Sequence, residues 1–358
     1  MSSGELRVAM IGHAFMGAAH SHAWRTAPHV FDLPLRPVMS VLCGRSVTPA
    51  SADRLGWNST ASDWPDVVTR DDIDLVDICV PGYLHEPIAI AALAAGKHVL
   101  CEKPLANTLA EASGMASAAG ASNAKAMVGF NYRRVPALAR ARTLVADGRI
   151  GQVREVRASY LQDWLADPLA PWTWRMSAEQ AGSGALGDIG SHIIDLAQYL
   201  TGSLITGVSA ISQTFTPERP GGPVTVDDAV LFTARLASGA IASFEASRVA
   251  TGQKNALRIE LYGTDGSIVF DLERLNELRV SERRVLVTEP GDPYLNAWWP
   301  PGHVLGWDAT FVHQVRDLVC GIASGADPAP TFADGLQVQR VLDAVARSAG
   351  NWTPIEES

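Results

Sequence analysis

The first third of the chain alternates short apolar runs with segments that can form helices. Apolar runs of this kind, stopped by glycine or proline, are typical of strands buried in a parallel sheet. They occupy residues 7–11, 38–43, 75–80, 98–101 and 126–130. Between two of them, the alanine-rich residues 88–95 end at Gly96, as helices often do. Strands joined by helices form right-handed βαβ units, so the pattern predicts an α/β domain with a parallel sheet.

The first apolar run leads directly into a glycine turn and a helical segment, the context of a dinucleotide-binding fingerprint. Glycine at the start permits the tight turn, and glycine at the end permits close packing of helix on strand. A pyrophosphate would then lie on the N–H groups of the helix N-terminus. Ala14 stands where the middle glycine is usual. The predicted cofactor-binding residues of this turn are Gly12, Ala14, Phe15, Met16 and Gly17. A purely structural turn is the alternative for so short a motif.

The residues after the second apolar run bear on the choice of cofactor. NAD enzymes usually place an acidic residue there to bind the ribose 2′-hydroxyl. This chain places Gly44, Arg45 and Ser46 there instead. A guanidinium and a hydroxyl suit a 2′-phosphate, so Arg45 and Ser46 favour NADP over NAD. Stacking of Arg45 on adenine is the alternative, and it fits either cofactor.

A lysine follows the fourth apolar run, in the sequence Glu102-Lys103-Pro104. Proline restricts the preceding residue and lacks the N–H that a central strand needs, so the strand ends here. Ligands of open α/β sheets bind at that edge. Far downstream, Asp188 and His192 stand four residues apart, so on a helix they share one face. We expect Lys103, Asp188 and His192 to meet over one substrate; an exposed ion pair is the alternative for Glu102 and Lys103.

After about residue 150 the pattern becomes β-rich. Strand-like segments at residues 229–236 and 240–247, and at 257–262 and 267–271, are separated by short turns, which predicts an antiparallel sheet. Two inserts carry tryptophans, and aromatic rings stack on the C–H faces of sugars; packing under long loops is the alternative.

Composition bounds the class of protein. A chain of 358 residues predicts two domains, and a net charge of −9 argues against a nucleic-acid partner. No apolar stretch reaches the roughly 18 residues that span a bilayer, so we expect a cytoplasmic protein without membrane contact. Four cysteines without a C-x-x-C pair suit buried free thiols. His20 and His22 lie two apart on a helix and do not share a face, so no metal site is predicted.

Several motifs, taken together, resemble the glucose-fructose oxidoreductase, inositol dehydrogenase and rhizopine-catabolism (Gfo/Idh/MocA) family over nearly the whole chain. The motifs are the fingerprint with His20, Pro81 with His85, residues 94–104, residues 129–133 and residues 184–192. Residues 160–164, 217–220 and 331–335 look like the levoglucosan dehydrogenase branch of that family.

This resemblance implies a Rossmann parallel sheet followed by an α+β domain with an open, mostly antiparallel sheet. We expect the first domain at residues 1–130 and the second at 131–333, with a helix at about 334–350 packing back on the first. The resemblance implies a bound NAD or NADP and a homo-oligomer, a dimer or tetramer, formed through the open sheet. Lys103, Asp188 and His192 match the family's catalytic residues. Further expected cofactor-binding residues are Pro81, His85, Glu102 and Lys103; expected substrate-binding residues are Tyr132, Arg133, Gln162, Trp164, Trp174, Asp188, His192 and Trp299.

The expected reaction is hydride transfer between a ring hydroxyl of a sugar, anhydrosugar or cyclitol and the nicotinamide, at C3 of levoglucosan or a glycoside for example. His192 would take the hydroxyl proton, because imidazole titrates near neutral pH, while Lys103 would stabilise alkoxide character. Lys103 as the base is the alternative. A glycosidase that oxidises C3 transiently is the first rival function, and a non-catalytic sensor of sugar or cofactor is the second.

Overall fold

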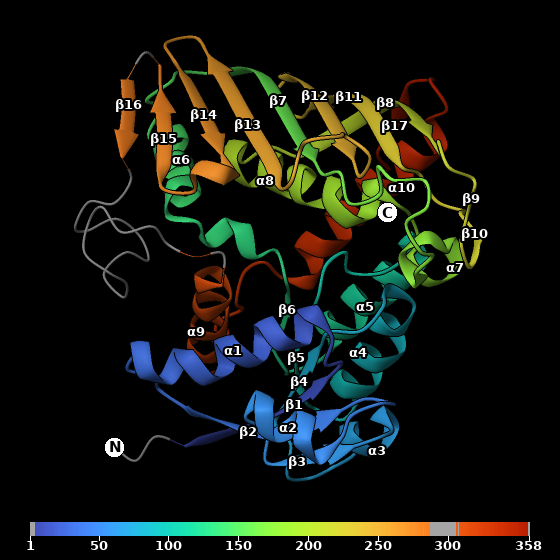
Figure 1. Cartoon of the computed structure of the whole chain (residues 1–358). Helices are drawn as coiled ribbons and strands as arrows, with labels where there is room; N and C mark the ends of the chain where they lie inside the picture. Colours follow the sequence, from blue (N-terminus) through green and yellow to red (C-terminus); the bar gives the residue numbers. More distant parts are fainter. Residues whose placement is uncertain (1–3, 282, 287–305, 307, 357–358) are drawn as a thin grey trace. The chain divides into compact units, whose positions relative to one another are not determined.

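The computed structural model describes residues 4–281, 283–286, 306 and 308–356. The chain divides into two compact units (Figure 1). The first unit comprises residues 1–131 and 306–336, and the second comprises residues 132–305 and 337–358. Sequence analysis placed the border after residue 130, one residue earlier. Trp299 lies outside the described residues.

The first unit is built on a six-stranded parallel sheet with the order β3-β2-β1-β4-β5-β6. This is the strand order of a dinucleotide-binding Rossmann fold, and it confirms the predicted α/β domain. Its strands are β1 (Glu5–Ile11), β2 (Arg36–Cys43), β3 (Ser59–Ala61), β4 (Leu75–Ile78), β5 (His98–Cys101) and β6 (Ala126–Val128). Sequence analysis missed β3, because three residues rich in Ser and Thr give no apolar run.

The helices of the first unit connect and flank these strands. They are α1 (Phe15–Val30), α2 (Pro49–Leu55), α3 (Trp64–Val68), α4 (His85–Ala94), α5 (Leu109–Ala121) and α9 (Ala309–Ser324). Thr108 begins α5 with a capping box, in which its hydroxyl accepts the N–H of Glu111 and the Glu111 carboxylate accepts the N–H of Thr108. Helix α9 packs on α1, where Phe31 and His313 approach to 5.2 Å between ring centres.

The second unit contains a nine-stranded sheet with the order β16-β15-β14-β13-β7-β12-β11-β8-β17. Neighbouring strands are antiparallel except for β7 and β12, which run parallel, so the expected mostly antiparallel sheet is confirmed. Its strands are β7 (Val153–Leu161), β8 (Ile205–Gln213), β11 (Ala229–Leu236), β12 (Ile241–Ser247), β13 (Ala256–Gly263), β14 (Ser267–Asp271), β15 (Glu277–Val280), β16 (Arg283–Leu286) and β17 (Thr353–Pro354). A separate ribbon pairs β9 (Glu218–Arg219) with β10 (Gly222–Pro223).

Two helices, α6 (Pro136–Ala146) and α8 (Ser191–Thr201), pack on the sheet of the second unit and on each other. A short helix, α7 (Ala178–Ala181), lies in the insert between β7 and α8. Along β11 and β12, buried and exposed residues alternate, so one face of the sheet is packed. The opposite face is open and exposes Ile211, Leu231 and Ile241.

The terminal helix α10 (Phe332–Ser348) corrects one expectation. Its residues up to Leu336 belong to the first unit, and from Gln337 onward it belongs to the second unit. The amide of Gln337 donates to the side-chain oxygen of Gln198 on α8 at 3.2 Å, and Ser348 accepts the N–H of Ala210 on β8 at 2.9 Å. The helical periodicity of this segment predicts a helix. It does not show which unit the helix packs on, because both units offer apolar surfaces.

Three of the four cysteines, Cys43, Cys79 and Cys101, are buried, and all four are free thiols as expected. Burial raises the pKa of Cys43 to about 11, so this thiol stays protonated and unreactive at neutral pH. Among the described residues, no helix combines the length and the apolar character needed to cross a membrane.

Candidate active site

The glycine turn of the first unit has the geometry of a phosphate-binding loop. Gly12 has φ +106°, a conformation that side chains rarely adopt, and a Cβ there would overlap the carbonyl of Cys79. A Cβ at Gly17 would overlap the carbonyl of Gly12. Helix α1 begins after Ala14 without a side-chain hydrogen bond at its N-cap, and the N-terminus of a helix favours an anion. These observations fit a pyrophosphate, with Phe15 and Met16 opening the helix.

The turn after β2 brings Gly44, Arg45 and Ser46 beside His13 of the glycine turn. The Ser46 hydroxyl lies 3.4 Å from Nε2 of His13, and a Cβ at Gly44 would come 2.9 Å from Nδ1 of the same ring. Arg45 and Ser46 are exposed at this edge of the sheet. The position suits recognition of an adenosine ribose, as expected at the end of the second strand of a Rossmann fold.

Lys103 follows β5 at the carboxyl edge of the parallel sheet, where sequence analysis placed it. Two residues that were expected to bind the cofactor, Glu102 and His85, make contacts inside the first unit instead. Glu102 is 5% exposed and its Oε1 lies 3.0 Å from Nε2 of His20. His85 is 2% exposed, with ring nitrogens facing the carbonyls of Val80 and Pro104 at 2.9 and 3.0 Å. Both side chains therefore hold protein groups rather than presenting themselves to a ligand.

Pro81, another expected cofactor contact in this unit, stands three residues beyond Ile78, which ends β4. It begins the short 3-10 helix Gly82–Leu84, which leads into α4. Its φ of −59° is the one that its ring imposes, so it turns the chain at the carboxyl edge of the sheet.

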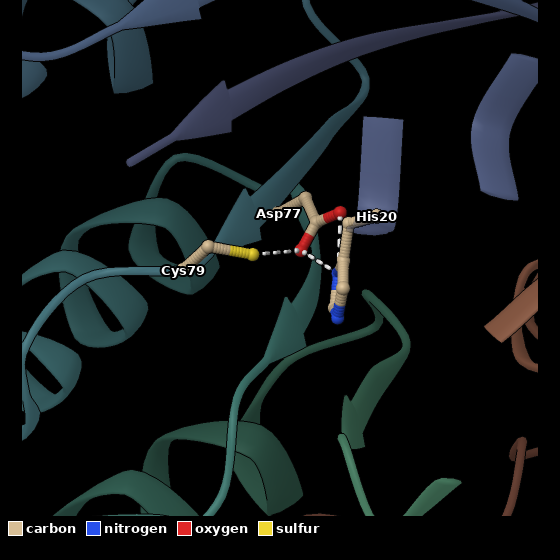
Figure 2. A group of neighbouring side chains, drawn as sticks. All are labelled: His20, Asp77 and Cys79. Carbon is tan, nitrogen blue, oxygen red and sulfur yellow. Dashed lines mark hydrogen bonds and ion pairs between the residues drawn. The ribbon is translucent and has the colours of Figure 1, made fainter. Parts of the chain in front are cut away.

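A buried polar cluster lies behind this edge (Figure 2). His20 on α1 places Nδ1 3.0 Å from both carboxylate oxygens of Asp77 on β4. Trp24 donates its indole N–H to Asp77 at 2.7 Å, and the Cys79 thiol donates to it at 3.5 Å. His20, Asp77 and Cys79 offer ligand-type atoms within 4.8 Å of one another, a grouping that the sequence spacing of the histidines did not suggest.

In the second unit, Asp188 and His192 lie at the start of one continuous helix. Asp188 is within a π-helical turn, Leu186–Gly190, that runs directly into α8, and His192 is in the first turn of α8. Asp227 fastens this start, since its carboxylate accepts the N–H groups of Gly184 and Leu186, each at 2.8 Å. Single π-helical turns recur at functional sites. Here the turn presents Asp188 with its side chain 29% exposed.

Arg248, directly after β12, is a buried cation that sequence analysis missed. Its side chain is 1% exposed, and Nη1 lies 3.9 Å from Oδ2 of Asp188. Its Nη2 donates to the main-chain carbonyl of Asp227 at 3.2 Å, and its guanidinium lies 5.4 Å from the ring centre of Trp164. Burial lowers the pKa of Arg248, and the charges of Asp188 and Asp227 oppose that shift. A guanidinium stays charged in proteins, so Arg248 keeps a positive charge beside Asp188.

A chain of hydroxyl and amide groups runs beside His192. Asn255 accepts at Oδ1 from the Tyr160 hydroxyl at 2.7 Å and from the Gln162 amide at 3.0 Å. Because Tyr160 donates there, the Tyr132 hydroxyl is the donor in the 2.9 Å bond between the two tyrosines. The His192 ring packs 4.6 Å from Tyr132 and 5.9 Å from Tyr160, centre to centre. Gln162 and Tyr132 were expected here; Tyr160 of β7 and Asn255, the residue before β13, join them.

Arg133 has a different task from the expected contact with substrate. Its guanidinium pairs with Asp195 of α8 at 2.6 Å and lies 5.1 Å from the ring centre of Tyr199. It therefore braces the helix that carries His192. Trp164 is 41% exposed beside Arg248, and Trp174 stacks with its neighbour Arg175 at 4.4 Å. Both tryptophans keep surface that could meet a ligand.

Comparison with known proteins assigns the family. Residues 6–130 match the family described as oxidoreductase family, NAD-binding Rossmann fold, and residues 138–269 match the GFO/IDH/MocA C-terminal domain. The chain belongs to the Gfo/Idh/MocA oxidoreductase family. The predicted resemblance is thereby confirmed, and the chain is an NAD(P)-dependent oxidoreductase acting on CH–OH groups.

Several members of this family are similar to the chain over nearly its whole length. Levoglucosan dehydrogenase of Pseudarthrobacter phenanthrenivorans is 41% identical, with 98% of each chain covered. The solved structure of levoglucosan dehydrogenase in complex with NADH and levoglucosan is 43% identical, covers 99% of this chain and 100% of that one, and has a TM-score of 0.96. An oxidoreductase domain protein from Kribbella flavida is 57% identical over 99% and 100%, also with a TM-score of 0.96.

These findings bear on the cofactor. The matched Rossmann family is described as NAD-binding, and NAD(H) is the cofactor that this fold binds. The preference for NADP that Arg45 and Ser46 suggested gains no support from them. No acidic residue stands directly after β2, where Gly44, Arg45 and Ser46 follow Cys43.

Proposed function

We propose that this protein oxidises a ring hydroxyl of a sugar or anhydrosugar, with levoglucosan as the first candidate, and passes the hydride to NAD. The placement of Asp188 and His192 on one fastened helix start supports this proposal most strongly. The similarity to levoglucosan dehydrogenase over nearly the full length of both chains supports the substrate class. That C3 is the oxidised position remains part of the proposal.

The residues of the first unit would hold the cofactor. The N–H groups at the start of α1 bind the pyrophosphate, and the turn of Gly44 to Ser46 with His13 binds the adenosine ribose. When bound, the cofactor supplies the hydride acceptor. Lys103 extends from the carboxyl edge of the sheet and donates a hydrogen bond to the reacting oxygen, which stabilises negative charge as the hydroxyl loses its proton.

The residues of the second unit would bind and deprotonate the sugar. His192 takes the hydroxyl proton, and its ring is kept in place by Tyr132 and Tyr160. Asp188 stays an anion beside Arg248 and accepts a hydrogen bond from a neighbouring hydroxyl. Burial raises the pKa of Tyr160 well above its usual range, so its phenol stays neutral and serves as a hydrogen-bonding group.

The test is an assay of the purified protein with NAD and NADP in parallel, against levoglucosan, glucose, a glucoside and an inositol. Formation of reduced cofactor with levoglucosan and NAD is the expected result. Lys103→Met and His192→Gln should each lower kcat by about a hundredfold or more, with cofactor binding unchanged. Turnover close to wild type in both variants would refute the proposed mechanism.

The same assay separates the rival functions. A glycosidase that oxidises C3 transiently would release the leaving group of the glucoside without net formation of reduced cofactor. A sensor would bind ligand without turnover. The choice between His192 and Lys103 as the base follows from the pH dependence of kcat, because the variant that loses the base should lose the acid limb of the profile.

The homo-oligomer stays a prediction. It would use the open face of the sheet in the second unit, where Ile211, Leu231 and Ile241 are exposed on neighbouring strands. A sheet face with such side chains suits contact with another protein surface.

A further inference from the structure

The buried cluster in the first unit joins side chains from three parts of the Rossmann fold. One of these side chains, Glu102, belongs to the residue directly before Lys103. His20 comes from α1, Asp77 from β4, and Glu102 follows β5. Their exposed fractions are 1%, 0% and 5%. Figure 2 shows the His20 ring lying against the Asp77 carboxylate. The other edge of the ring meets Glu102 at 3.0 Å, so the imidazole links two carboxylates.

The contacts of the ring fit its doubly protonated form. An ionised carboxylate only accepts hydrogen bonds, and both nitrogens of His20 face carboxylate oxygens at 3.0 Å, so each nitrogen donates an N–H. Burial is the largest single influence and lowers the pKa of His20, but the charge of Asp77, its hydrogen bond to the ring and the Cys79 thiol together outweigh burial, and the pKa is raised well above its usual range. The ring is therefore an imidazolium, a cation shared between Asp77 and Glu102.

A metal ion is the other use that this cluster could have. His20, Asp77 and Cys79 are close enough to ligate one. A metal ligand, however, needs a lone pair on the ring nitrogen, and a ring that donates from both nitrogens has none. Asp77 also accepts the Trp24 indole N–H at 2.7 Å, which occupies a second position on its carboxylate. The contacts favour a hydrogen-bonded ion network.

The segment that carries Lys103 is held on both sides. Before it, Glu102 is fixed by His20, and its main-chain N–H donates to the carbonyl of Ile78 at 3.0 Å. After it, the carbonyl oxygens of Pro104 and Leu105 lie 3.0 and 3.2 Å from Nδ1 of His85. A Cβ at Gly129 would come 2.7 Å from Oε1 of Glu102, so the lack of a side chain at Gly129 leaves the space that this carboxylate occupies.

We propose that His20 is a positioning residue: as a buried imidazolium it fixes Glu102, and through Glu102 it sets the backbone from which Lys103 reaches the reacting oxygen. The proposal rests on the role proposed for Lys103. A displacement of a catalytic group by about 1 Å can reduce a rate by roughly a hundredfold. A buried ion network that keeps this backbone in place therefore supports the rate. Loss of the imidazolium would leave two carboxylates buried in one place, where like charges repel and the segment must shift.

The experiment compares His20→Gln in two backgrounds, the wild type and Lys103→Met. In the wild-type background, kcat should fall by about tenfold or more, with the NAD dissociation constant changed by less than about threefold. In the Lys103→Met background, the same substitution should change kcat by less than about twofold, because the group that His20 positions is gone. The change in melting temperature should be the same in both backgrounds.

Two further variants keep the test decisive. Glu102→Gln preserves shape but removes a charge, and it should reproduce the background-dependent loss even where His20→Gln folds poorly. His98→Gln is the matched control: it replaces a half-buried histidine on β5 whose ring accepts the N–H of Lys125, and kcat should stay near wild type.

Equal losses of kcat in both backgrounds, or no loss in the wild type, would overturn the positioning role. Such a result would leave the proposed function intact if Lys103→Met alone remains strongly impaired. Wild-type turnover in Lys103→Met would instead refute the proposed function.

Discussion

Each unit of this protein buries a charged side chain near residues assigned to chemistry, but the two do so differently. In the first unit, His20 contacts Asp77 and Glu102 at 3.0 Å, and all three are almost fully buried. In the second, Arg248 reaches Asp188 only at 3.9 Å, and that carboxylate keeps 29% of its side-chain surface exposed. The tight network fixes a backbone, whereas the looser pair keeps an anion charged and still open to a ligand.

The largest expected effect tests how the second unit builds its helix start. In Gly184→Ala, the new Cβ would overlap the main-chain oxygen of Asp227 and come 2.6 Å from Nη2 of Arg248. The helix start would have to move, so we expect a loss of several kcal/mol in unfolding free energy, about 3 or more, and a loss of activity. Thermal unfolding and kcat measure both.

Gly120→Ala in the first unit is the control for that substitution. Gly120 lies in α5, and a Cβ there meets nothing within 4 Å. Alanine is a better helix former than glycine by up to about 1 kcal/mol, so the control should be neutral or stabilised. Equal melting temperatures for the two variants would show that the close approach of Gly184 to Asp227 is not needed.

The next effect tests the looser ion pair. Arg248→Met removes the cation but keeps much of the side-chain volume, which leaves Asp188 and Asp227 without their shared partner. We expect kcat/KM to fall by about 10- to 100-fold, and the acid limb of its pH profile to move to higher pH, because Asp188 would take up a proton more readily.

Arg219→Met separates that effect from a general loss of packing. Arg219 is also buried in the second unit, where it donates to the carbonyls of Asp167 and Leu165 at 2.6 and 2.8 Å. Its loss should lower stability but leave the pH profile in place. An unshifted profile in Arg248→Met would show that Arg248 does not control the charge of Asp188.

The two units also differ in how far their sequences predict them. Strand β11 was expected at residues 229–236 and is found at Ala229–Leu236. Strand β8 (Ile205–Gln213) was missed, since its small and polar residues give no continuous apolar run. Glycine turns and strand ends are local features, so the turn before α1 and the end of β5 could be placed from sequence, while the cofactor contacts stay a prediction.

The partners of the site residues could not be predicted in the same way. His20 and Asp77 are 57 residues apart, and Tyr160 and Asn255 are 95 apart. Nothing in a local pattern specifies which distant strand supplies an acceptor or a cation. For this reason Arg248 was missed, and His85 was assigned to the cofactor when its ring in fact holds protein carbonyls.

The smallest expected effect concerns the tight network and the pH dependence of stability. The pKa of His20 is raised in the folded protein, so above the unfolded value of about 6.5 the native state holds a proton that the unfolded state has lost. The stabilisation is complete below pH 6.5 and declines as pH rises toward the folded pKa, with a slope of at most about 1.4 kcal/mol per pH unit.

Urea unfolding of the wild type and His20→Gln between pH 6.5 and 8 measures that slope, which the substitution should remove. Burial raises the pKa of the neighbouring Cys79 thiol, but an unfolded thiol loses its proton only near pH 8.5, above this range. His98→Gln is the control, because burial lowers the pKa of His98, so any slope from this ring has the opposite sign and is confined to the acid end of the range. If the unfolding free energy changes with pH by the same slope in the wild type and in His20→Gln, His20 is not an imidazolium. The network around His20 would then differ from the pair of Arg248 and Asp188 only in the distances between the groups.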